Sequence, residues 1–233
     1  MEFRLLRADE IDCRISICNE YGVGLLLYKD ARCDQNILDE TVGAMNWQRH
    51  HSRDNANCIV SLWDSEKQQW IQKEDTGKES FTEAEKGLAS DSFKRACFNW
   101  GIGRELYTAP DMFVRKKDLA KHEQYNGKWT CKDSFVVTAI EYIDRKIVYV
   151  KVLNTKTNGE IEFGTPAKIA QEQEQIAGQI IDSVKVKVLR KQCSELGIDE
   201  SKVYGRYGKK SLEELTEADF VKAIQGLNAS KKE

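Results

Sequence analysis

Hydrophobic and polar residues alternate along several short stretches in the first part of the chain. Residues 13–17 alternate in this way, glycines interrupt the pattern at 22–24, and an apolar run follows at 25–28. A period of two is typical of half-buried strands, and glycines between two such runs predict a hairpin. Short polar gaps separate three further strand-like runs, which predict an antiparallel meander at 46–52, 58–63 and 70–74.

Two helices are predicted around this meander. Asp30 is a suitable N-cap for a short helix that carries Ile37 and Leu38 and ends at Gly43. After the meander, Thr82 and Glu85 have the spacing of a capping box, in which each side chain accepts a hydrogen bond from a free backbone N–H group. Apolar residues then recur at helical spacing up to Gly101 and Gly103, and we expect them to form the buried face: Ala89, Phe93, Ala96, Cys97 and Trp100.

The rest of the chain changes pattern twice. Between 111 and 163, Asn126-Gly127, Asn158-Gly159 and the pair Asp144-Arg145 lie between strand-like runs, so we expect added β-hairpins there. From Pro166 the chain loses aromatic residues and becomes helical, with one helix marked by Ile181, Val184, Val188 and Leu196 and another starting at Thr216. These changes predict a core over 1–165, a linker helix over 166–180 and a small helical domain over 181–233.

The composition is that of a globular protein. Apolar residues make up 40 % and charged residues 32 % of the 233 residues, and the mean hydropathy is −0.59. The first ten residues mix charge into every turn, and no apolar run approaches the roughly 18 residues of a spanning helix, so we expect neither a signal peptide nor a membrane segment. Seven scattered cysteines without a Cys-x-x-Cys pair, and only three histidines, favour reduced thiols in the cytoplasm over disulfides or a metal site.

Motifs for catalysis are missing from the sequence. There is no P-loop, no dinucleotide-binding fingerprint and no Gly-x-Ser-x-Gly motif. One catalytic alternative stays open, a metal-dependent nuclease. Its Mg²⁺ would be held by carboxylates near the predicted meander, Asp64, Glu74 and Asp75. Because nothing else demands chemistry, we expect a binding protein rather than an enzyme, with no cofactor and no metal.

The net charge of −2 restricts how this chain could bind a polyanion. A protein that binds nucleic acid with its whole surface would be basic, so here the positive charge must gather on one face. The helix after the meander offers such a face, because Lys86, Ser90 and Lys94 follow one another at helical spacing with Arg95 beside them.

The same helix carries a recognisable signature. Its residues Glu85-Lys86, Ser90-Asp91, Lys94-Arg95-Ala96 and Trp100-Gly101, followed by Leu106-Tyr107, resemble the Rad52/Rad22 family and its phage relatives of the Sak type, which are single-strand annealing proteins. The order of a hairpin, a short helix, a meander and this helix also fits, and the resemblance covers about residues 10–110. The hairpin region at 111–163 has no counterpart in the family pattern.

The resemblance implies an α+β fold in which an antiparallel β-meander packs on a long helix, with subunits assembled into a ring or a filament. Single-stranded DNA would lie in a basic groove with its bases left free for pairing. Lys94 and Arg95 resemble the basic pair that lines this groove, and Arg32 resembles a second groove arginine. Lys78 is near the place where the family contacts a second DNA segment.

Other basic residues are candidates from their positions alone. We expect Lys86 on the cationic helix face, and Arg49, Arg53 and Lys73 on the meander, to line the groove if they point outward, which the period of two does not fix. The run 115–117 is typical of a solvated loop, with contact to a second strand as the alternative.

We therefore predict ATP-independent binding and annealing of single-stranded DNA in recombination and double-strand break repair, by a phage recombinase. The alternatives are a passive single-strand-binding protein, the nuclease above, and a scaffold whose basic helix binds an acidic protein. The expected partners are single-stranded DNA and further copies of the chain. The C-terminal domain is expected to recruit the host single-strand-binding protein or a phage exonuclease, or, at the least, to cap and stabilise the core.

Overall fold

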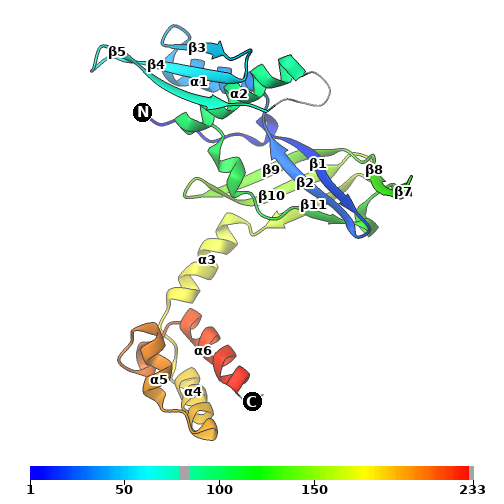
Figure 1. Cartoon of the computed structure of the whole chain (residues 1–233). Helices are drawn as coiled ribbons and strands as arrows, with labels where there is room; N and C mark the ends of the chain where they lie inside the picture. The colour runs from blue at the N-terminus through cyan, green and yellow to red at the C-terminus, as the bar shows by residue number, and fades with distance from the viewer. Residues whose placement is uncertain (79–83, 231–233) are drawn as a thin grey trace. The chain divides into compact units, whose positions relative to one another are not determined.

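The computed structural model describes residues 1–78 and 84–230, with side chains omitted for 84–86 (Figure 1). The chain divides into two compact units, Met1–Ala167 and Lys168–Glu233.

An antiparallel six-stranded sheet forms one part of the first unit, with the strand order β11-β10-β9-β1-β2-β6. Its strands, in chain order, are β1 (Asp12–Asn19), β2 (Gly22–Tyr28), β6 (Phe113–Arg115), β9 (Phe135–Ile143), β10 (Lys146–Asn154) and β11 (Gly159–Gly164). The hairpins predicted at the two ends of the core sequence are thus joined, because β1 pairs with β9 through Asp12 and Cys13. What the sequence pattern predicts as an addition is an integral part of the unit.

The predicted meander is confirmed as a separate three-stranded sheet of order β3-β4-β5, visible above the larger sheet in Figure 1. Its strands are β3 (Trp47–Ser52), β4 (Asn57–Asp64) and β5 (Gln69–Thr76). A short ribbon of β7 (His122–Tyr125) and β8 (Lys128–Cys131) turns at Asn126-Gly127, where both residues have positive φ, as a type I′ hairpin turn requires.

Two helices pack beside the meander. Helix α1 (Ala31–Val42) begins at Asp30, whose side chain accepts a hydrogen bond from the Cys33 N–H, and ends at Gly43, as predicted. Helix α2 (Ala84–Trp100) ends before Gly101 (φ 97°), also as predicted, and packs against β4 and β5. The capping box assigned to Thr82 lies outside the described residues.

One hydrophobic core runs through both sheets and both helices of the first unit. Its fully buried members include Val23 of β2, Ile37 of α1, Val60 of β4, Phe93 of α2 and Val150 of β10. The mixed α+β class with antiparallel sheets is confirmed, whereas the ring or filament stays a prediction.

The second unit is helical. After α3 (Ala167–Gly178), in which every residue is exposed or half-buried, it contains α4 (Ser183–Leu196), α5 (Glu200–Tyr204) and α6 (Glu217–Ser230). Thr216 and Asp219 form the predicted cap of α6: the Thr216 hydroxyl accepts a hydrogen bond from the Asp219 N–H, and the Asp219 carboxylate accepts one from the Thr216 N–H.

The helix predicted from Ile181, Val184, Val188 and Leu196 is confirmed as α4, but other residues form its buried face. Ile181 precedes the helix, and Val184 and Val188 are exposed, whereas Val186, Leu189 and Cys193 are buried. Valines alternate with lysines at the start of this helix, so two faces carry apolar residues and only packing selects between them.

All seven cysteines are free thiols. Within the described residues, no helix has the length and apolar character needed to cross a membrane.

Candidate nucleic-acid interface

The strand register decides which basic residues of the meander share a face. Arg49, Val60 and Lys73 lie opposite one another on β3, β4 and β5. Residues directly opposite in an antiparallel sheet point to the same side. Val60 is fully buried, and the Trp100 indole N–H of α2 donates a hydrogen bond to the Val60 carbonyl at 3.0 Å. Arg49 and Lys73 therefore flank α2 on the helix-covered face.

Each of these two cations contacts an aromatic ring of α2. The guanidinium carbon of Arg49 is 4.9 Å from the centre of the Phe93 ring, and the Lys73 Nζ atom is 4.3 Å from that of Trp100. Lys73 also donates a hydrogen bond to the Asn99 carbonyl at 2.8 Å, at the negative end of the helix. Both cations are thereby fixed in place, Arg49 with its side chain exposed and Lys73 half-buried.

The Lys94-Arg95 pair lies on α2 between solvent and the core. Both side chains are half-buried, so neither belongs to the core. Arg95 pairs with Asp75 of β5, with 3.3 Å between Nε and Oδ1, and keeps 39 % of its side chain exposed. The register places Asp75 on the same face as Lys73, two residues away along the strand.

On its other side, α2 covers a buried ion pair. Lys29 and Asp34 are 1 % and 0 % exposed and hydrogen-bond to each other. The Lys29 Nζ atom also lies 4.6 Å from the centre of the Phe98 ring. Burial raises the pKa of Asp34 to about 6, and the charges of Lys29 and Lys94 oppose this shift. The positive charge of Lys94 thus stabilises the ionised Asp34 of α1, whereas Arg95 forms its ion pair with Asp75 of β5.

Two further candidates lie beside the middle of α2. Arg53 is exposed in the β3–β4 turn, and the next residues are tied to the helix because the Ser92 hydroxyl donates to the Asn55 carbonyl at 3.0 Å. Lys78 is exposed after β5, and its N–H donates to the Asp91 carboxylate at 2.9 Å. A Cβ atom on Gly77 would be 2.5 Å from the Ser92 nitrogen, so only glycine permits this close approach.

The last two candidates are placed less directly. Arg32 lies in the first turn of α1 with 85 % of its side chain exposed and pairs with Asp30 at 2.9 Å. Lys86 lies in α2, but its side chain is outside the described residues. The structure therefore gathers Arg49, Arg53, Lys73, Lys78, Lys94 and Arg95 around one helix. We call these six residues the α2 cluster.

The carboxylates of the nuclease alternative are not brought together. Glu74 and Asp75 are neighbours on β5 and point to opposite faces, and Asp64 lies at the other end of the meander, opposite Gln69. Each is engaged nearby: Glu74 with Asn57, Asp75 with Arg95, and Asp64 with Lys67. Within the described part of the chain, no group of three His, Cys, Asp or Glu residues is placed to hold a metal ion.

Sequence reasoning missed the residues that position the α2 cluster. The sequence does not indicate that Lys29 and Asp34 are buried together, since a lysine after a strand and an aspartate in a helix are ordinary surface residues. Phe93 and Trp100 were predicted as core, and the structure adds that their rings hold Arg49 and Lys73. The register of the meander would have revealed this, but sequence alone does not fix it.

Comparison with known proteins identifies the segment that carries this geometry. Residues 35–125 match the family model of the Rad52/22 family double-strand break repair protein. The match runs from within α1, through the meander and α2, to the end of β7, and it confirms the predicted resemblance at the level of the Rad52/22 family. No curated protein and no solved structure matches the chain.

Proposed function

On the premise that residues 35–125 are of the Rad52/22 family, we propose that this protein binds single-stranded DNA along the α2 cluster and anneals complementary strands. It does so in recombination and double-strand break repair, without ATP and without a catalytic step. The observation that carries the proposal is the meeting of cations from α2, β3 and β5 around one helix inside the matched segment. Phosphates require cations but no base readout, so this arrangement supports binding of any sequence.

The weak net charge fits an oligomer. A chain with net charge −2 has no excess of positive charge by itself, but a ring or filament repeats the α2 cluster once in each subunit along the strand. In our proposal β3 and β5, the two edge strands of the meander, are available as joints between subunits. The assembly would act in the cytoplasm of a bacterial host, as part of a phage recombination system.

We extend the proposal to the second unit as a partner-binding module. A pocket of about 190 Å³ lies between α5 and α6 and is lined by apolar residues together with three exposed cations: Lys202, Arg206 and Lys222. An acidic peptide with one apolar side chain complements such a pocket. We propose that the host single-strand-binding protein or a phage exonuclease supplies it.

The central test replaces Lys94 and Arg95 by alanine. Because two phosphate contacts are lost, we expect similar weakening for every oligonucleotide sequence and a salt slope that is flatter by about one to two units. Fluorescence anisotropy of labelled oligonucleotides at several salt concentrations measures both quantities. Light scattering should give the wild-type particle size.

A matched control is K146A/K156A, which removes two exposed lysines of the six-stranded sheet, one at the first residue of β10 and one in the turn between β10 and β11. This variant should bind as the wild type does. If the folded K94A/R95A variant binds as tightly as this control, the α2 cluster is not the DNA site. A second measurement separates annealing from passive coating: the wild type should accelerate duplex formation between complementary strands, whereas a passive binder would slow it.

A further inference from the structure

The β7–β8 ribbon has two chemically different faces. Side chains alternate along each strand, so His122, Gln124, Trp129 and Cys131 share one face, and Glu123, Tyr125, Lys128 and Thr130 share the other. The first face is fixed against the protein, since the His122 and Trp129 rings stack at 4.8 Å and the His122 Nε2 atom is 2.7 Å from the Asn19 carbonyl oxygen. The second face is turned away from β1.

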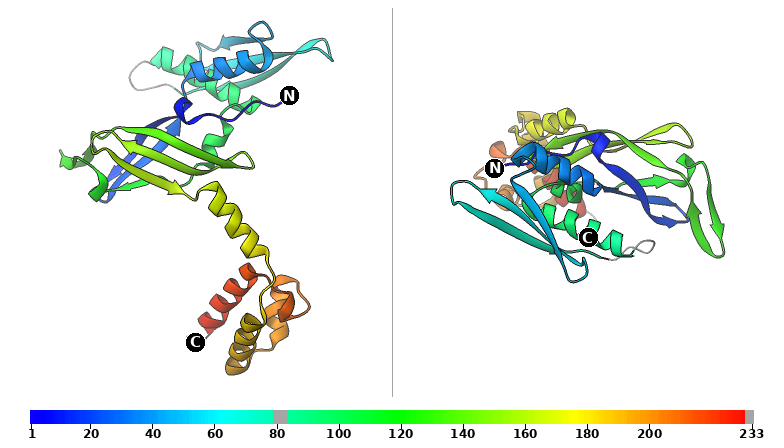
Figure 2. Two further views of the ribbon diagram at one scale, coloured as in Figure 1. Left: turned by 180° about the vertical axis from the view of Figure 1, so that it is seen from behind. Right: turned by 90° about the horizontal axis from the view of Figure 1, so that it is seen from above.

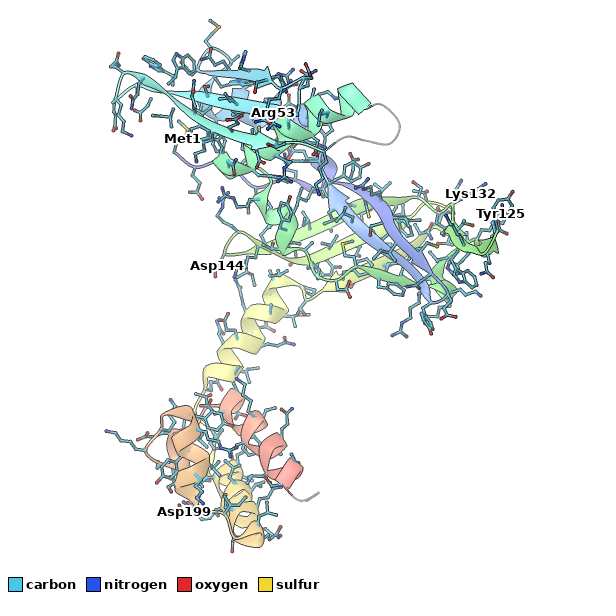
Figure 3. All side chains as sticks on the ribbon, in the orientation of Figure 1. Met1, Arg53, Tyr125, Lys132, Asp144 and Asp199 are labelled. Carbon is cyan, nitrogen blue, oxygen red and sulfur yellow. The ribbon has the colours of Figure 1, made fainter. Side chains whose placement is uncertain are left out.

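The outward face carries an exposed aromatic ring among lysines. Tyr125 is 68 % exposed and lies directly opposite Lys128 across the ribbon. Lys121 and Lys132, one residue beyond each strand end, continue the same alternation and are exposed. Figure 3 labels Tyr125, beside the turn of the ribbon, and Lys132, which follows the other end of β8. We call Lys121, Tyr125, Lys128 and Lys132 the ribbon face.

The charge of this region departs sharply from that of the chain. Residues 115–132 contain six lysines and arginines but two acidic residues, so the segment has a net charge of +4 within a chain of −2. One of the two acids, Glu123, is paired with Lys121 at 2.9 Å. Lys116 belongs to the other face of the ribbon, because its Nζ atom lies 5.4 Å from the centre of the Trp129 ring.

We infer that the ribbon face is a second site for single-stranded nucleic acid, with lysines contacting phosphates and Tyr125 stacking on a base. An aromatic ring among exposed cations is the combination that binds single strands without reading their sequence. The inference rests on the proposed function and adds to it a place for the second strand. The family match ends at Tyr125, so Lys128 and Lys132 lie outside it.

The site is separate from the α2 cluster. Helix α2 lies beside the meander, whereas the ribbon lies at the far end of the six-stranded sheet, and the views of Figures 1 and 2 agree on this separation. A nucleotide bound at one site is therefore not in contact with the other site of the same subunit.

The test uses the full chain already loaded with an unlabelled oligonucleotide. A second, non-complementary labelled oligonucleotide is then added, and its capture and the annealing rate of complementary strands are measured. For K128A/K132A we expect first-strand affinity within about twofold of wild type, at least fivefold weaker second-strand capture, and a capture salt slope flatter by about 1.4, or 0.7 for each lost phosphate contact.

Tyr125 gives an independent measurement. Y125A should weaken capture by at least about fivefold, and Y125F should restore it, because the ring and not the hydroxyl stacks on the base. The control K146A/K156A should match the wild type in every measurement.

Two results would overturn the inference. One is second-strand capture by K128A/K132A equal to that of the control. The other is an equal loss of first-strand and second-strand binding, which would make the ribbon part of the first site. Loss of first-strand binding by K94A/R95A remains a separate result, so failure of the ribbon site and failure of the proposed function are distinguishable.

Discussion

The α2 cluster and the ribbon face place positive charge in opposite ways. In the α2 cluster, Arg95 is held by Asp75, Lys73 by the Asn99 carbonyl and Arg49 by the Phe93 ring. On the ribbon face, Lys128 and Lys132 are exposed, at the first residue of β8 and just after its end. Cations fixed during folding lose little further side-chain entropy when they bind, whereas exposed lysines must be ordered by the ligand. The first arrangement favours a defined path for a strand, and the second favours loose capture.

The two regions also depend on different supports. The α2 cluster rests on the continuous core, through Phe93 and the buried Lys29–Asp34 pair. The ribbon rests on β1 and on the hydrogen bonds of Asp133 at its base. Two variants remove these supports separately and a third releases Arg95 from Asp75, which gives three ways to test the comparison.

The largest expected effect comes from D34N. Asparagine cannot neutralise Lys29, and an unpaired buried charge costs about 3–5 kcal/mol. We expect the free energy of unfolding in urea to fall by that amount, with DNA binding by the α2 cluster lost on mild warming.

The matched control for this variant is D30N. Asp30 begins the same helix, but asparagine is also a good N-cap, so D30N should stay close to wild type. A loss of less than about 1 kcal/mol for D34N would contradict the role assigned to the buried pair.

A smaller effect is expected from D75N, which removes the anion beside Arg95. Exposed ion pairs contribute about 0.2–1 kcal/mol, so releasing Arg95 should tighten single-strand binding by about 1.4-fold to fivefold. Anisotropy titration measures the change. The neighbouring E74Q is the control, because Glu74 points to the opposite face of β5, and a comparable gain in E74Q would show that only overall charge matters.

The smallest effect is a local loss of stability in acid. Burial opposes ionisation of Asp133, but hydrogen bonds from Asn154 and from the N–H groups of Ala120 and Lys121 outweigh it and lower the pKa of this carboxyl. A lowered pKa stabilises the folded state above the ordinary value of 3.8, and this stabilisation is lost as the pH falls below that value.

Hydrogen exchange of the ribbon amides between pH 5 and pH 3 measures this loss. Protection should decrease in acid in the wild type, while D133N should be less protected at pH 5 and vary little with pH. Unchanged wild-type protection across this range would contradict the role of Asp133. The amides of α2 serve as the internal reference.

Local patterns in the sequence determined most of the secondary structure. Helix boundaries follow from single residues: the Asp30 side chain caps the start of α1, and the positive φ of Gly43 and Gly101 ends α1 and α2. The ribbon turn is likewise local, because both Asn126 and Gly127 adopt positive φ. The signature on α2 also resembles the Rad52/Rad22 family and lies within residues 35–125, which match the model of that family.

Only the tertiary structure decided which faces these elements bury and which distant strands they join. Arg49 and Lys73 share a face because of the meander register, β1 joins β9 across more than a hundred residues, and α4 buries Val186 instead of Val184. Alternation and helical spacing specify that an element has two faces, but they do not specify its neighbours. That choice depends on the shape of the whole core, to which residues far apart in the chain contribute together.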